Sequence, residues 1–456
     1  MAVTKADFGE NFVWGVSTAA YQTEGGHNAD GKGKSIWDVF SATPGKIKNG
    51  DHGHVACDFY SRYAHDIALM SQMNIPNFRF SISWSRIMPN GAGFVNQKGI
   101  EFYNKVIDFC LDVGIEPWIT LYHWDLPNEL EKQGGWTNRK IIDWFTDYVE
   151  VCVKHFGDRV KNWMVLNEPM VFTGAGYFLG IHAPGRKGLS NFLAATHHAA
   201  MCQAQGGRVI KSLLPQAKVG TTFSCSLVEP YRNNRLDNNA TVKVDALLNR
   251  LFVEPLAGMG YPLKELRFLR RLEPFIKDGD ESKLAFNMDF IGIQNYTREM
   301  VSYSPFTPFI FAKIIKAHQR NCISTVMDWE VYPPSIYEML KKFSAYKNFG
   351  EVTVTENGAA FPDTVTNGEV HDEHRKAYLQ QHIRQVLKAK QERVNVTGYF
   401  VWSFTDNFEW AEGYHPRFGI VHINFATQKR TIKSSGKWYS QLLRNDVLIG
   451  EEVAVI

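Results

Sequence analysis

Short apolar runs alternate with longer amphipathic segments along the whole chain. The runs are rich in β-branched and aromatic residues, which favour strands, and several are apolar at nearly every position. Parallel strands that are covered on both faces have this pattern. We therefore predict eight strands, at residues 12–17, 77–84, 117–124, 163–167, 218–224, 290–296, 352–355 and 397–403.

The segments between these runs have helical periodicity. Within residues 98–113, the apolar side chains that share one helix face are Ile100, Tyr103, Val106, Ile107 and Cys110. Residues 139–156 show the same spacing, and residues 371–391 form an amphipathic stretch whose acidic beginning suits a helix N-terminus. Strands that alternate with helices predict βα units and a parallel sheet.

Eight βα units predict an α/β protein that forms a single (β/α)₈ TIM barrel over residues 1–456. An open, doubly wound sheet is the alternative. That fold commonly places a glycine-rich GxGxxG turn after its first strand, and this sequence has no such turn there. No linker of biased composition divides the sequence, so we expect one catalytic domain.

The composition argues against several classes of protein. The formal net charge is +3, which gives no reason to expect a nucleic-acid partner. The six cysteines form no CxxC pair and have no metal-ligand spacing, so we expect neither a metal nor another cofactor. The sequence has no apolar signal region at its start and no run of about 18 apolar residues, so we expect a cytoplasmic protein without a membrane partner. The oligomeric state stays open.

Carboxylates stand at the ends of two predicted strands. In a barrel of this kind, the active site forms at the C-terminal ends of the strands. Glu168 follows the fourth predicted strand and Glu356 follows the seventh. Each alone is compatible with a structural carboxylate. Together they would lie across the barrel mouth from each other, where two carboxylates can hydrolyse a glycosidic bond.

Arg79 is the only basic residue inside an apolar predicted strand. A buried arginine needs an anionic partner, and we expect Glu356, whose ionised form the arginine would favour. A bridge to a helix carboxylate is the alternative. The negative charge on Glu356 would then raise the pKa of Glu168 and keep it protonated. Asn167 adjoins Glu168 and can donate to a substrate hydroxyl, although an asparagine at a strand end is also a common turn residue.

With these residues in hand, the chain closely resembles the family 1 glycoside hydrolases, the β-glucosidase family, from FVWGVSTAAYQTEGG to WSFTDNFEWAEGYHPRFG. The resemblance implies that Glu168, in NEP, is the acid/base and that Glu356, in TENG, is the nucleophile of a retaining mechanism. Tyr296 and Arg79 match residues beside the nucleophile. The expected substrate-binding residues are Gln22, His123, Trp124, Asn167, Asn295, Trp329, Trp402, Glu409 and Trp410.

The chain departs from the family pattern at three places. Gln294 stands where the family usually has an asparagine, which is one methylene shorter. Val165 replaces a threonine and removes a hydroxyl. Residues 302–322 carry no family signature, and they could wall the leaving-group side of the pocket or form a surface excursion with a helix.

The expected function is exo-acting hydrolysis of small β-glycosides or short oligosaccharides. A 6-phospho-β-glycosidase is one alternative, but it would need a Ser or Lys cluster for the phosphate where this chain has Glu409 and Trp410. A non-catalytic sugar-binding protein is another, but it would lack one of the two glutamates. The sequence leaves the preferred sugar open among glucose, galactose and fucose.

Overall fold

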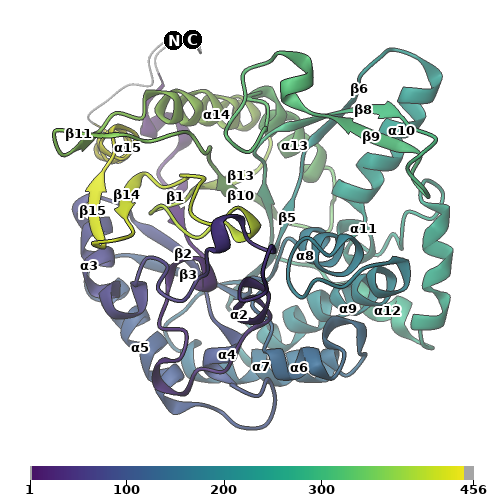
Figure 1. Cartoon of the computed structure of the whole chain (residues 1–456), viewed down its shortest axis with the longest axis horizontal. Coiled ribbons are helices and arrows are strands. Elements are labelled where there is room, and N and C mark those ends of the chain that lie inside the picture. Colours follow the sequence, from purple (N-terminus) through teal and green to yellow (C-terminus); the bar gives the residue numbers. More distant parts are fainter. Residues whose placement is uncertain (1–2, 446–456) are drawn as a thin grey trace.

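Eight parallel strands close into a barrel at the centre of the molecule (Figure 1). The computed structural model describes residues 3–445, so residues 1–2 and 446–456 of the expected domain lie outside the described part. The strands of the barrel are β1 (Val13–Ser17), β2 (Asn77–Ser81), β3 (Glu116–Tyr122), β4 (Asn162–Asn167), β5 (Lys218–Ser224), β7 (Phe290–Gln294), β10 (Glu351–Asn357) and β13 (Val396–Trp402). All eight predicted strands are confirmed.

Helices surround the barrel and cover its outer face (Figure 1). The three predicted helices correspond to α5 (Gln97–Asp112), α7 (Ile141–Phe156) and α14 (Glu373–Gln391). None of the helices within residues 3–445 is long and apolar enough to cross a lipid bilayer. The remaining α-helices are α1 (Ala20–Thr23), α2 (Ile36–Ser41), α3 (Phe59–Gln72), α4 (Trp84–Ile87), α6 (Asn128–Lys132), α8 (Pro169–Thr173), α9 (Leu189–Leu213), α10 (Arg235–Asp245), α11 (Val253–Leu256), α12 (Asp280–Leu284), α13 (Pro334–Ser344) and α15 (Ser434–Arg444).

Two local predictions are corrected. The second strand ends at Ser81 instead of residue 84, because Trp84 begins α4 and its ring stacks on Tyr148 of α7, outside the barrel. Residues 302–322 were expected as a wall or a helical excursion. Their first part instead pairs as strands β8 (Arg298–Tyr303) and β9 (Ala312–Ile315), and a short 3₁₀ turn at Ala317–Arg320 follows.

Small additional sheets lie outside the barrel. Strand β6 (Leu227–Pro230) pairs in parallel with β8, which pairs antiparallel with β9. This accessory sheet and α10 lie together at the upper right of Figure 1. Two further antiparallel pairs are β11 (Val365–Thr366) with β12 (Glu369–Val370), and β14 (Val421–Asn424) with β15 (Lys429–Ile432).

Large apolar side chains fill the interior of the barrel beneath the pocket. Trp118, Met164, Phe290 and Phe400 pack together from four different strands, and each is at most 2% exposed. The Trp118 ring makes edge contacts with the rings of Phe290 and Phe400. Such a layer is a packed core and not a pore, so polar groups above it have no access to water from below.

Gly358 follows β10 where the chain passes Trp402 very closely. A Cβ atom built on Gly358 would lie 1.7 Å from the carbonyl oxygen of Trp402, which is backbone and cannot rotate away. We predict that Gly358→Ala lowers the free energy of unfolding by about 3 kcal/mol, the upper end of the usual overpacking cost. Thermal or urea unfolding measures this loss.

Gly174 offers the matched control, because its added Cβ would meet only the flexible end of Met170, at 3.0 Å. Gly174→Ala should leave the unfolding free energy within about 1 kcal/mol of the wild type. Equal stability of the two variants would contradict the predicted clash.

Candidate active site

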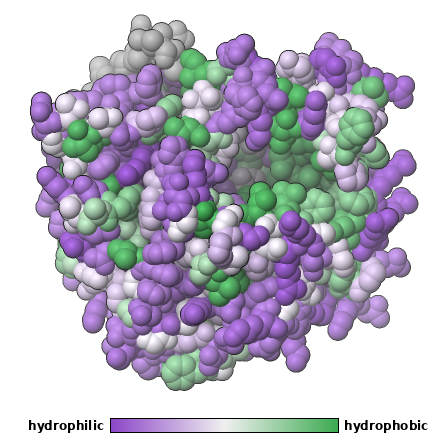
Figure 2. Space-filling model, viewed as in Figure 1, coloured by the Kyte–Doolittle hydropathy of each residue, from purple (hydrophilic) through white to green (hydrophobic). Residues whose placement is uncertain are grey.

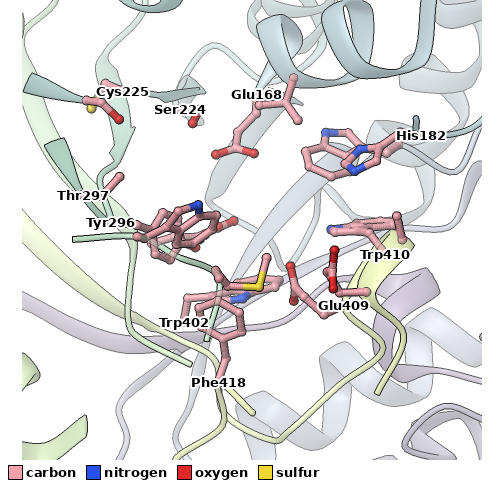
Figure 3. Close-up of a pocket in the computed structure, with 18 of the residues that line it drawn as sticks. Glu168, His182, Ser224, Cys225, Tyr296, Thr297, Trp402, Glu409, Trp410 and Phe418 are labelled. Carbon is pink, nitrogen blue, oxygen red and sulfur yellow. Dashed lines mark hydrogen bonds between the residues drawn. The ribbon is translucent and has the colours of Figure 1, made fainter. Parts of the chain in front are cut away.

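A pocket of about 410 Å³ opens at the C-terminal ends of the barrel strands. Figure 2 shows the corresponding hollow in the molecular face, with apolar residues in and around it. Figure 3 shows carboxylates and aromatic rings converging on this space. The predicted residues that line it are His123, Trp124, Glu168, Tyr296, Trp329, Glu356, Trp402, Glu409 and Trp410.

Glu356 is held by three hydrogen-bond donors. Its Oε1 accepts from Arg79 Nη1 at 2.5 Å and from Gln294 Nε2 at 2.7 Å. Its Oε2 accepts from the Tyr296 hydroxyl at 2.6 Å. The ion pair that we expected between Arg79 and Glu356 is therefore present, and its side chains are 0% and 5% exposed. Three donors on one carboxylate favour its ionised form and fix its orientation.

Asn167, at the end of β4, links β2, β5 and β7 at this cluster. Its Oδ1 accepts from Arg79 Nη2 at 2.5 Å, from Gln294 Nε2 at 2.7 Å and from Thr222 Oγ1 at 2.9 Å. Since Arg79 can only donate, these bonds settle which end of the Asn167 amide is oxygen. Its Nδ2 then faces His123 Nε2, at 3.0 Å. Burial, and secondarily the charge of Arg79, lower the pKa of His123 well below its usual value, so the ring is neutral.

Glu168 lies just past β4, at the start of α8. Its backbone is left-handed, with φ 46°, which is uncommon for a non-glycine residue. Pro169 follows at the first helical position, where its fixed φ is favourable. This sharp turn from strand to helix places the Glu168 carboxyl in the pocket (Figure 3). Trp124 and Trp410, which also line the pocket, have positive φ as well, so three residues of the site have this uncommon backbone conformation.

The surroundings favour different protonation states for the carboxyl groups of Glu168 and Glu356. Burial and then the charge of Glu356 raise the pKa of Glu168 well above its usual value. Burial also raises the pKa of Glu356, but Arg79 and the Tyr296 hydroxyl act in the opposite direction. Glu168 has no hydrogen-bonded cation, whereas Glu356 has one. The stable arrangement is therefore a protonated Glu168 beside an ionised Glu356.

The opposite side of the pocket combines flat rings with a further carboxylate. Trp402, Glu409 and Trp410 lie together below and to the right in Figure 3. Gln22 Nε2 donates to Glu409 Oε2 at 3.2 Å, and its own Oε1 is buried without a protein partner. Burial and the charge of Glu356 raise the pKa of Glu409 to about 8. Rings and paired polar groups of this kind suit the apolar faces and hydroxyl edges of a sugar.

A buried ion cluster fixes the loop that carries Glu409 and Trp410. Asp406, another acid near the end of the eighth strand, does not line the pocket. Its carboxylate accepts from Lys433 at 2.6 Å and Arg417 at 3.2 Å, and from the backbone N–H groups of Gly419 and Ile423. The cluster thus joins this loop to the C-terminal part of the described chain.

The predicted substrate-binding residues Gln22, Asn167 and Asn295 are not part of the pocket lining. Gln22 and Asn167 hydrogen-bond Glu409 and His123, which line it, whereas the Asn295 amide bonds backbone oxygens and α13. The Nδ2 of Asn295 donates to the backbone oxygens of Cys225 and Thr297, at 2.9 and 3.2 Å, and to Ser335 Oγ at 2.9 Å. Its neighbours Gln294 and Tyr296 both bond to Glu356, because the backbone turns at the end of β7. The expectation that Asn295 contacts substrate is corrected: its amide ties the ends of β5 and β7 to α13.

The structure shows where two of the departures from the family pattern lie. Gln294 reaches both Glu356 and Asn167, so the extra methylene does not remove it from the cluster. Val165 is fully buried on the outer side of β4, against Gly206 of α9, so its missing hydroxyl lies away from the pocket.

Sequence reasoning missed Ser224 as part of the site and left the role of Gln294 open. Ser224 lines the pocket, and its hydroxyl lowers the pKa of Glu168 against the larger effect of burial. A signal was present in the sequence, because Ser224 is the last residue of the fifth predicted strand.

An eight-stranded parallel barrel whose mouth holds one protonated and one ionised carboxyl group, beside tryptophan platforms, is the arrangement of a glycoside hydrolase. Comparisons with known proteins agree. The sequence model of glycosyl hydrolase family 1 matches residues 4–447. The chain belongs to this family and is a glycosidase.

Named relatives match over almost their whole length. Beta-glucosidase A of Thermotoga maritima is 46% identical over 443 residues, which is 97% of this chain and 98% of the relative. Beta-glucosidase A of Acetivibrio thermocellus is 40% identical over 450 residues, or 97% and 100% of the two chains. A solved family 1 β-glucosidase from Thermotoga maritima superposes with a TM-score of 0.93 at 45% identity, covering 96% of this chain and 98% of that one.

We predict that Asn295→Ala acts on stability and not on substrate binding. The variant removes the Asn295 donor from the backbone oxygen of Cys225, while the Thr297 oxygen keeps the Ser335 hydroxyl at 2.8 Å, and we expect a cost of about 1–3 kcal/mol of unfolding free energy. The Michaelis constant for an aryl β-glucoside, measured below the unfolding temperature, should stay within about threefold of the wild type because the side chain lies outside the pocket. A large rise in the Michaelis constant with unchanged stability would restore Asn295 as a substrate ligand.

Proposed function

We propose that this glycosidase is an exo-acting, retaining β-glucosidase in which Glu356 is the nucleophile and Glu168 is the acid/base. The observation that carries this assignment is the unequal support of the two carboxyl groups. Glu356 is bonded to Arg79, Gln294 and Tyr296 and is kept ionised, as an attacking group must be. The raised pKa of Glu168 keeps its proton available for the leaving oxygen.

The reaction then has two steps. Glu168 gives its proton to the glycosidic oxygen while a carboxylate oxygen of Glu356 attacks the anomeric carbon, and the leaving group departs. The product is a glycosyl ester on Glu356, which carries no charge. The charge that raised the pKa of Glu168 is therefore gone, so Glu168 can take a proton from water. That water attacks the anomeric carbon from the side the leaving group vacated, the bond from this carbon to Glu356 breaks and releases the carboxylate, and the configuration is retained.

The binding of the terminal sugar falls to the remaining pocket residues. Trp402 and Trp410 offer ring faces, Gln22 and Glu409 offer polar atoms to adjacent hydroxyls, and neutral His123 exchanges hydrogen bonds with another. Asn167 orients the 2-hydroxyl, whose hydrogen bonds strengthen in the transition state. Trp124 and Trp329 complete the walls; the Trp124 indole N–H donates to the Asn167 carbonyl at 2.9 Å.

The relatives support glucose as the terminal sugar. The similar chains are named β-glucosidases, and solved structures of the Thermotoga maritima enzyme are in complex with glucoimidazole and with deoxynojirimycin. Another is in complex with a galacto-hydroximolactam, which supports a side activity on galactosides and leaves fucosides open. We extend the proposal to a single catalytic domain over residues 1–456 and to a cytoplasmic location. A 6-phospho-sugar is disfavoured because the acids Glu409 and Glu356 lie where a phosphate would need a Ser or Lys cluster, and the charge of Glu356 would repel it.

The two glutamates should differ in chemical rescue. In Glu356→Ala, hydrolysis of an aryl β-glucoside should fall to background, and added azide should attack from the vacated side and give an α-glucosyl azide. In Glu168→Ala, a substrate with a poor leaving group should lose about 10²–10⁴-fold in rate, the usual contribution of general acid catalysis. Azide should there yield a β-glucosyl azide through the intact ester. NMR of the products distinguishes the anomers, and identical anomers from both variants would refute the roles.

The pH dependence of kcat/KM should show which carboxyl group holds the proton. Activity should fall on the alkaline side as Glu168 loses its proton, because its raised pKa sets that limit. It should fall on the acidic side as Glu356 gains one. In Glu168→Gln, assayed with a dinitrophenyl glucoside that needs no acid, the alkaline fall should disappear and the acidic fall should remain. Persistence of the alkaline fall would assign it to another group, such as Glu409.

A further inference from the structure

A polar wall borders the pocket beyond Glu168. Strand β5 continues through Ser224, Cys225 and Ser226 into β6, and β7 continues through Tyr296 and Thr297 into β8, so these segments run side by side. In Figure 3, Ser224, Cys225 and Thr297 lie on the left, His182 and Trp410 lie on the right, and Glu168 is between them. If Glu168 protonates the leaving oxygen, the leaving group must lie against this wall.

Glu299 is the acidic residue of this wall. It lines the pocket from β8, where it pairs with Val228 of β6. The side chain is partly buried, and the described residues offer it no ion pair within 4.0 Å and no hydrogen bond. Burial raises the pKa of Glu299, and the charges of Lys316 and Arg320 act against this from farther away.

Two of the cations near Glu299, Arg298 and Arg320, are paired with other acids, and Lys316 lowers the pKa of Glu299 without an ion pair within 4.0 Å. Arg298 is adjacent in sequence, yet its guanidinium bonds Glu330 at 2.9 Å and Glu229 at 2.8 Å. Arg320 also bonds Glu330, at 2.6 Å. A half-buried carboxylate that is left out of such a network retains unused acceptor capacity, and it gains most from a ligand that supplies donors.

The apolar residues of the same pocket indicate which ligand fits. Met327, Trp329 and Phe418 line the same pocket with apolar surface, and the Trp329 ring lies 5.2 Å from that of Tyr296. A leaving group with an apolar face and a rim of hydrogen-bond donors matches both walls. A second pyranose has this shape, because its ring face is apolar and its hydroxyls point outward.

We propose that Glu299 determines leaving-group specificity by accepting hydrogen bonds from the hydroxyls of a sugar leaving group, so that the enzyme favours β-linked disaccharides over simple aryl glucosides. This inference rests on the proposed function, because it assigns the leaving-group side from the role of Glu168. It concerns Glu299 among the five pocket acids, since Glu168, Glu356 and Glu409 are assigned to the terminal sugar and its bond. The fifth, Glu412, forms an ion pair with Lys48.

The test compares Glu299→Ala and Glu299→Gln on cellobiose and on 4-nitrophenyl β-glucoside. Loss of a hydrogen bond to a charged acceptor predicts about a tenfold fall in kcat/KM on cellobiose for the alanine variant. Glutamine keeps a neutral acceptor and should lose about threefold. Both variants should stay within about twofold of the wild type on the aryl glucoside, which carries no hydroxyls for Glu299 to bind.

A second measurement uses the glycosyl-enzyme itself. When the aryl glucoside forms this intermediate, added glucose competes with water for it, and Glu299→Ala should lower the ratio of transfer to hydrolysis by about tenfold. Glu101→Ala is the matched control, since Glu101 is exposed on α5 and far from the accessory sheet (Figure 1). Glu101→Ala should change neither kcat/KM on the two substrates nor the ratio of transfer to hydrolysis.

The outcomes distinguish failure of the role proposed for Glu299 from failure of the proposed glucosidase function. Equal losses on both substrates would make Glu299 a structural residue and overturn the inference. Unchanged activity on cellobiose, or a wild type that cleaves only the aryl glucoside, would also overturn it while leaving the glucosidase activity intact. A wild type that cleaves neither glucoside would instead overturn the proposed function.

Discussion

The buried ion pair between Arg79 and Glu356 is the constraint on which the site depends. A guanidinium that is fully buried inside a barrel is stable only with an anionic partner and with its remaining donors satisfied. Glu356 and the amide oxygen of Asn167 fill these needs, and the apolar layer around Met164 closes the space beneath. Arg79 therefore ties β2 to β4 and β10, three strands whose ends must come together for catalysis.

The same ion pair makes the two glutamates chemically different. Both are buried and both carry raised pKa values, so burial alone would keep both protonated. The contacts of Glu356 with a cation and two neutral donors favour its ionised form. Its charge in turn raises the pKa of Glu168. In the proposed mechanism, one arginine on β2, a strand that adjoins neither β4 nor β10, thus makes one carboxyl group the nucleophile and the other the acid. The loss of that charge in the glycosyl ester then lets the acid act as a base.

In the proposed function, the barrel and the accessory sheet bind different parts of the substrate. In this proposal, the terminal sugar meets residues from the barrel strands and from the loop after β13, which the buried cluster around Asp406 and Lys433 holds in place. The proposed leaving-group side lies where β5 and β7 extend past the barrel rim into the accessory sheet. This division allows the leaving-group preference to vary through β8 and its neighbours without disturbing the catalytic strands, because active-site loops vary on a fixed barrel scaffold.

Hydrophobic periodicity determined the eight strands, the principal helices and the barrel, since parallel strands that are covered on both faces must be apolar along their length. Strand ends and family motifs identified both glutamates and most of the pocket, and the lone arginine in an apolar strand pointed to its partner. Only the tertiary structure decided that Asn295 faces α13 while Gln294 reaches Glu356, and that Glu299 is left without a cation. The reason is that a sequence shows which groups are present, whereas the direction of a side chain at a strand end and the choice among competing partners depend on packing between elements far apart in the chain.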